Sequence, residues 1–180
     1  MEKKKNIRSL SSSTILAIDP GYGRCGWAII KKNNSKNLDK NISLVCCDLI
    51  ETHKSKCLPE RLSELYVSIE YIIKKYKPSA LAIESLFWFK NKKTAMNVAQ
   101  ARGVIIVAAK NHNLDIYEYT PLQVKSSVVG YGKATKEQIQ KMLRLHLSCQ
   151  NTPLQDDTAD AVAVGLTHVY TNRFQSLNHK

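Results

Sequence analysis

The sequence predicts an α/β domain, a mixed sheet of five strands flanked by helices. Short apolar runs of strand length alternate with longer amphipathic stretches whose apolar residues recur at helical spacing. Along the chain the expected order is three strands, a helix, a strand, a helix, a strand and further helices, which is typical of a sheet with helices on its faces. The chain has 180 residues, 43% of them hydrophobic, which suits one domain with an ordinary buried core.

The first three strands are expected in the first third of the chain. Residues 14–19 form a short apolar run, a turn follows at residues 20–21, and residues 26–30 form a second apolar run. The polar, lysine-rich stretch 31–41 is expected to be a loop. Residues 42–51 then make a plausible third strand.

Helices and strands alternate in the rest of the chain. Pro59 suits the first turn of a helix, and Pro78 ends the same helix. The expected elements are a helix over 59–76, a strand over 79–84, a helix over 92–111, a strand over 115–119, a helix opened by a capping box of Thr135 and Gln138, and a final helix over 157–171. We expect one domain over 14–172, a disordered basic tail over 1–13 and a short tail over 173–180.

Composition excludes several classes of protein. No apolar run approaches the roughly 18 residues that a membrane span needs, and the N-terminus lacks the apolar region of a secretory signal. The five cysteines form no C-x-x-C pair and no framework spacing, which fits reduced thiols. We therefore expect a cytoplasmic protein with no membrane partner.

The net charge of +12 indicates a polyanionic partner such as nucleic acid. Ten lysines and arginines but only three acids lie between Lys90 and Arg144, so the charge is concentrated there. A lysine-rich composition that covers every surface is the alternative, and charge alone does not separate the two.

Two apolar runs, ILAID and ALAIE, each end in a carboxylate, Asp19 in the first and Glu84 in the second. Sites on open α/β sheets gather at the carboxyl ends of strands, so neighbouring strands would bring these two acids into one crevice. Asp157 and Asp160 lie three residues apart at the start of a helix and share a face. A helix cap is the alternative for this pair, because acids also favour the helix dipole.

Four carboxylates from two strand ends and one helix start can hold two divalent cations. Oxygen ligands favour magnesium, with manganese as the alternative, over zinc. Two such ions stabilise the attacking and leaving oxygens of a phosphodiester. The acids and the basic surface together predict a nuclease.

The chain resembles the RuvC family of crossover junction endonucleases, which have an RNase H-like fold. The resemblance runs from Ile15 to Tyr170. Its matching stretches are ILAIDPG, ALAIESLFWFKN, AMNVAQARGVIIVAA, YTPLQVKSSVVGYGKATKEQI and DDTADAVAVGLTH. The resemblance implies a structure-selective DNA endonuclease that resolves Holliday junctions by paired metal-dependent nicks during recombination and repair.

The resemblance also implies roles for individual residues. The metal-binding and catalytic residues would be Asp19, Glu84, Asp157 and Asp160. The expected DNA-binding residues are Phe87, Lys90, Arg102, Lys125 and Lys136, with Phe87 placed near the crossover. The alternatives are a core position for the phenylalanine and a solvated helix face for the lysines.

Partners follow from the resemblance as well: four-way junction DNA, a second copy of the chain in a homodimer, and a branch-migration helicase complex of RuvA and RuvB. The helix rich in small residues after Lys93 is the candidate dimer interface, with ordinary core packing as its alternative. The chain departs from the expected pattern at residues 22–25, YGRC, where small polar residues would be usual, and this could alter how the first strand turn meets DNA.

Three other functions would share some of these sequence features. An actin-like or sugar-kinase ATPase would need a second glycine-rich turn, and residues 80–89 contain no glycine. A nuclease of the same fold that cuts RNA–DNA hybrids or structured RNA would carry similar acids. A non-catalytic binder of branched DNA would be expected to lack at least one of the four acids.

Overall fold

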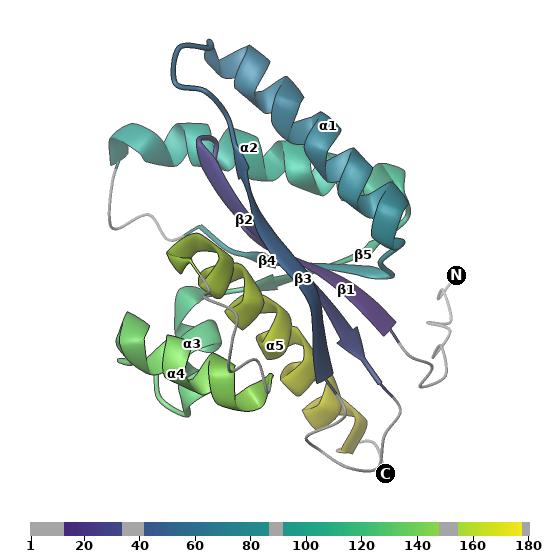
Figure 1. Ribbon diagram of the computed structural model, residues 1–180, viewed down its shortest axis with the longest axis vertical. Helices are drawn as coiled ribbons and strands as arrows, with labels where there is room; N and C mark the ends of the chain where they lie inside the picture. Colours follow the sequence, from purple (N-terminus) through teal and green to yellow (C-terminus); the bar gives the residue numbers. More distant parts are fainter. Residues whose placement is uncertain (1–12, 34–41, 87–91, 148–154, 178–180) are drawn as a thin grey trace, which may run out of the picture.

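The chain forms a three-layer α/β domain in a computed structural model, with a twisted central sheet between two layers of helices (Figure 1). The structure describes residues 13–33, 42–86, 92–147 and 155–177. The strands are β1 (Ser13–Asp19), β2 (Arg24–Lys32), β3 (Ile42–Glu51), β4 (Ala80–Glu84) and β5 (Asp115–Tyr119). The helices are α1 (Leu58–Tyr76), α2 (Lys92–Asn111), α3 (Pro121–Val129), α4 (Lys136–His146) and α5 (Asp156–Leu177).

The sheet has the strand order β3-β2-β1-β4-β5. Strands β1, β2 and β3 pair antiparallel as a meander, whereas β4 runs parallel to both β1 and β5. The predicted five-stranded mixed sheet is therefore confirmed. The two strands that end in acids, β1 and β4, are direct neighbours, as the sequence-based argument required.

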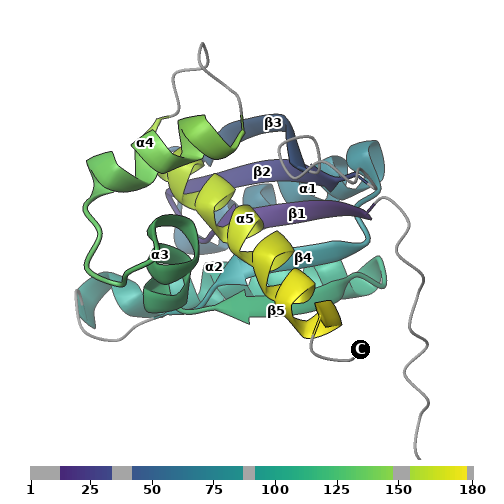
Figure 2. The ribbon, with the colours of Figure 1, turned by 90° about the horizontal axis from the view of Figure 1, so that it is seen from below.

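Side chains of the central strands alternate between two cores, because successive residues of a strand point to opposite faces. In β1, Leu16 and Ile18 join the core under α1 and α2, while Ile15 and Ala17 join the core under α5. Figure 2 shows α5 lying across the sheet, with α3 and α4 outside it. Helices thus cover both faces of the sheet.

Helix α3 was not expected from the sequence. Thr120 caps it by accepting a hydrogen bond from the backbone N–H of Gln123, whose side chain in turn accepts from the Thr120 backbone N–H. Pro121 occupies its first turn and Gly130 ends it at a φ of 92°. Helix α5 is also longer than the expected 157–171.

No helix in the part of the chain that the structure describes is long and apolar enough to cross a bilayer. The expected basic tail lies outside the described residues apart from Ser13, as do residues 34–41 of the expected loop. The division into tails and one domain stays a prediction.

Candidate active site

Asp19 and Glu84 lie side by side at the ends of adjoining parallel strands. The register pairs Ile18 with Ile83, so the next residue of each strand is one of these acids. The close approach of Glu84 is one of the causes that raise the pKa of Asp19. The backbone register therefore brings the two acids to neighbouring strand ends, as the sequence-based argument required.

Helix α5 reaches the two acids because it crosses β2 at a glycine. Gly26 pairs with Asp19 across β1 and β2. A Cβ atom built on Gly26 would lie 2.0 Å from the carbonyl oxygen of Asp157, so only glycine permits this close contact. The first turn of α5 is thereby seated next to Asp19, and Asp157 and Asp160 arrive with it.

Burial and mutual repulsion raise the pKa values of three of the acids. The pKa of Asp19 rises to about 8, first because the group is buried and then because Glu84 and Asp160 are close. Burial is also the largest cause that raises the pKa of Glu84 and of Asp160. Clustered carboxylates that resist ionisation are a feature of functional sites that bind a cation or move a proton.

Basic side chains of the protein partly balance this negative charge. The Nε of Arg24 donates to Oδ2 of Asp157 over 2.7 Å. The Nζ of Lys136 lies 3.8 Å from carboxylate oxygens of both Asp156 and Asp160. Lys125, at the half-buried face of α3, lowers the pKa of Glu84 and of Asp160 through its charge. Two of the three lysines expected to bind DNA, Lys125 and Lys136, therefore lie beside the acids.

The donor set fits hard divalent cations. The four carboxylates offer only oxygen ligands, and the raised pKa of Asp19 shows that negative charge is crowded there. Within the described residues, no three His, Cys, Asp or Glu side chains are already close enough together to hold an ion. Oδ2 of Asp157 accepts a hydrogen bond from Arg24, so a bound ion has to compete with the guanidinium for this oxygen.

Of the other residues expected to bind DNA, only Arg102 lies within the described residues. Arg102 lies on α2 and pairs with Glu118 of β5 over 2.5 Å, and its side chain is largely buried. Phe87 and Lys90 lie outside the described residues.

Two residues of the site were missed by reasoning from the sequence. Gly26 was assigned only to a strand, although a glycine inside a strand run signals a close backbone approach. Arg24 belongs to the YGRC segment that departs from the expected pattern, but its contact with Asp157 spans 133 positions and has no local signal.

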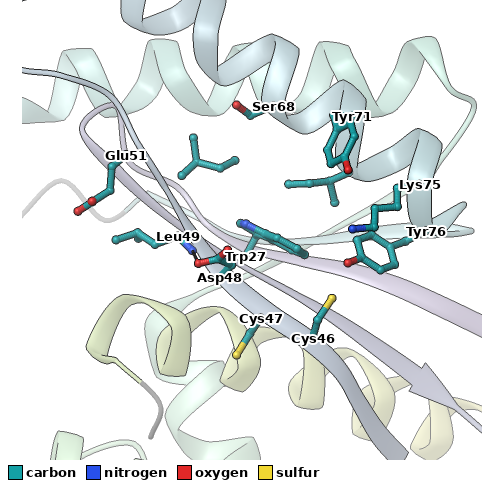
Figure 3. A pocket seen from close by; sticks show the side chains of 12 residues that line it. Trp27, Cys46, Cys47, Asp48, Leu49, Glu51, Ser68, Tyr71, Lys75 and Tyr76 are labelled. Atoms are coloured by element: carbon teal, nitrogen blue, oxygen red, sulfur yellow. Dashed lines mark hydrogen bonds between the residues drawn. The ribbon is translucent and has the colours of Figure 1, made fainter. Parts of the chain in front are cut away.

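The described residues also form a cavity of about 450 Å³ between β3 and α1, away from the acids (Figure 3). Trp27, Tyr71 and Tyr76 line it, and Glu51 lies at one end. None of the four carboxylates lines this cavity. The cavity is therefore separate from the four acids.

Comparison with known proteins gives one family. The family model described as crossover junction endodeoxyribonuclease RuvC matches residues 15–168. A RuvC from Natranaerobius thermophilus is 43% identical over 90% of this chain and 98% of its own length. A RuvC from Fusobacterium nucleatum is 46% identical over 86% of this chain and 79% of its own.

Solved structures agree. The RuvC of Thermus thermophilus superposes with a TM-score of 0.82 at 28% identity, covering 90% of this chain and 96% of that chain. The same protein has been solved in complex with a Holliday junction substrate, and that structure also gives a TM-score of 0.82 at 28% identity. Sequence match and fold agree over nearly the whole chain, which belongs to the RuvC family of crossover junction endodeoxyribonucleases.

Proposed function

We propose that this chain is a structure-selective endonuclease that resolves Holliday junctions by paired nicks during recombination and repair. The observation that carries the proposal is that Asp19, Glu84 and the first turn of α5 meet at the carboxyl ends of β1 and β4. Family membership gives the reaction, and the junction-bound structure of the T. thermophilus relative supports the choice of substrate.

In this proposal Asp19, Glu84, Asp157 and Asp160 hold two Mg²⁺ ions, with Mn²⁺ as the alternative metal. When bound, such ions lower the pKa of the attacking water and stabilise both the attacking and the leaving oxygen of the phosphodiester. The buried acids of β1 and β4 supply rigid ligands because the register of two paired strands fixes their backbone.

The basic side chains around the acids are proposed to orient the DNA backbone. Lys125 and Lys136 already lie within the field of the carboxylates, so a phosphate that approaches the site meets them. Phe87, Lys90 and Arg102 remain proposed contacts from the resemblance, with Phe87 near the crossover.

We also propose that the chain acts as a homodimer in the cytoplasm with a RuvA and RuvB helicase complex. Two nicks on strands of like polarity need two active sites related by a two-fold axis. Met96, Gln100, Gly103 and Val107 form an exposed stripe at helical spacing along α2, which supports this helix as the dimer contact. Light scattering of the purified protein tests the dimer, and a monomeric mass at micromolar concentration would contradict it.

The test of the function is cleavage of three matched substrates: a synthetic four-way junction, a linear duplex and an RNA–DNA hybrid. We expect paired nicks in the junction with Mg²⁺, none after chelation, and little cutting of the duplex or the hybrid. Preferred cleavage of the hybrid would assign the chain to a different nuclease activity. Junction binding with no cleavage in any divalent metal would make it a binding protein.

A further inference from the structure

Arg24 contacts two acids that lie on different elements. It is the first residue of β2 and lies two positions before Gly26, so its side chain points to the face of the sheet on which α5 begins. Its Nε donates to Oδ2 of Asp157 over 2.7 Å, and its Nη1 donates to Oε1 of Glu51 over 2.9 Å. Glu51 is the residue of β3 that pairs with Arg24 across the sheet.

The ion pair between Arg24 and Asp157 opposes metal binding by Asp157. A divalent ion at Oδ2 of Asp157 would lie next to a fixed positive charge, and like charges at contact distance repel. Oδ2 would have to give up the hydrogen bond from Arg24 before it could bind an ion fully. Because the side chains of Arg24 and Asp157 are 56% and 31% exposed, the ion pair is weak enough for a bound ion to break.

Glu51 is a second ion-pair partner for the Arg24 guanidinium. Its side chain is 60% exposed and lies across the strand pair from Arg24, at the sheet edge. When Asp157 turns away, Arg24 keeps one carboxylate partner, so its charge is not left without a counter-ion.

We propose that Arg24 is a positioning residue that occupies Oδ2 of Asp157 in the metal-free protein, competes with divalent ions for this oxygen and so sets the divalent-ion concentration that the enzyme needs. The proposal rests on the proposed function, because it takes Asp157 as a metal ligand. It predicts that removal of the guanidinium strengthens metal binding. If Arg24 instead oriented Asp157 for the metal, its removal would weaken metal binding.

The test is calorimetric titration of the DNA-free protein with Mn²⁺, which measures binding without any need for cleavage. Arg24→Gln should bind Mn²⁺ roughly three- to ten-fold more tightly than the wild type, the range expected when one nearby positive charge is removed at high dielectric. Arg24→Lys retains a cation at this position and should remain within about two-fold of the wild type. Arg144→Gln removes an equal charge from the exposed side of α4 and should leave the affinity unchanged.

The proposal would be overturned if Arg24→Gln bound Mn²⁺ no more tightly than the wild type while unfolding at the same temperature. The proposed function would then still stand. Equal tightening by Arg144→Gln would also overturn it, since net charge alone would then explain the effect. An absence of Mn²⁺ binding in the wild type and in every variant would overturn the proposed function, and this inference with it.

Discussion

Replacing Gly26 by alanine tests how the site is assembled. The new Cβ would lie 2.0 Å from the carbonyl oxygen and 2.6 Å from the carbonyl carbon of Asp157, and ordinary contact begins at 3.4 Å. The first turn of α5 therefore has to move by about 1.4 Å, because both groups in contact are backbone. Displacement of catalytic groups by 1 Å can cost about a hundred-fold in rate, so we expect at least that loss of junction cleavage. Overpacking costs about 1–3 kcal/mol of stability, so the variant should still fold.

The assay is single-turnover cleavage of a four-way junction at saturating Mg²⁺, with urea unfolding measured in parallel. Gly23→Ala is the matched control, because its Cβ would meet only the end of the Arg61 side chain, which can swing away. That variant should cleave within about three-fold of the wild type, since it displaces no ligand. Wild-type cleavage by a folded Gly26→Ala protein would refute the claim that this contact positions the α5 acids.

Asp19→Asn should abolish cleavage but leave junction binding largely intact, and it should raise the melting temperature in chelator because it removes one of the repelling buried acids; full cleavage would remove Asp19 from the mechanism. Lys125→Ala should weaken junction binding and reduce its salt dependence by about one unit of slope, and an unchanged slope would place this lysine off the DNA. His168 is buried against Tyr119, with a 2.8 Å hydrogen bond, and burial lowers its pKa from 6.5 to about 4. The neutral ring is the folded form, so its contribution is present above pH 6.5 and is lost as the pH falls toward 4. We expect about 2 kcal/mol of unfolding free energy to be lost between pH 7 and pH 5, and less in His168→Gln; an equal loss in both proteins would contradict the assignment.

The strands that carry the acids could be predicted from the sequence for a physical reason. A central strand of a covered sheet is buried on both faces, so it appears as a short unbroken apolar run, and a carboxylate at its end stands out. This pattern identified Asp19 and Glu84, while helical spacing identified Asp157 and Asp160 as one face. Their convergence could only be inferred conditionally, because it depends on which strands are neighbours.

Features that depend on tertiary contact could not be predicted in the same way. The need for glycine at position 26 follows from where α5 crosses β2, and the pairing of Arg24 with Asp157 follows from the same crossing. Helix α3 is a different kind of miss, since Thr120, Pro121 and Gln123 form a local capping signal.

The most direct test of the central claim is the anomalous diffraction of a crystal of this protein grown with Mn²⁺. The account predicts anomalous peaks between the carboxylate oxygens of Asp19, Glu84 and Asp160, with Asp157 turned from Arg24 toward the ions. The absence of any peak at these oxygens, at a Mn²⁺ concentration that supports junction cleavage, would contradict it.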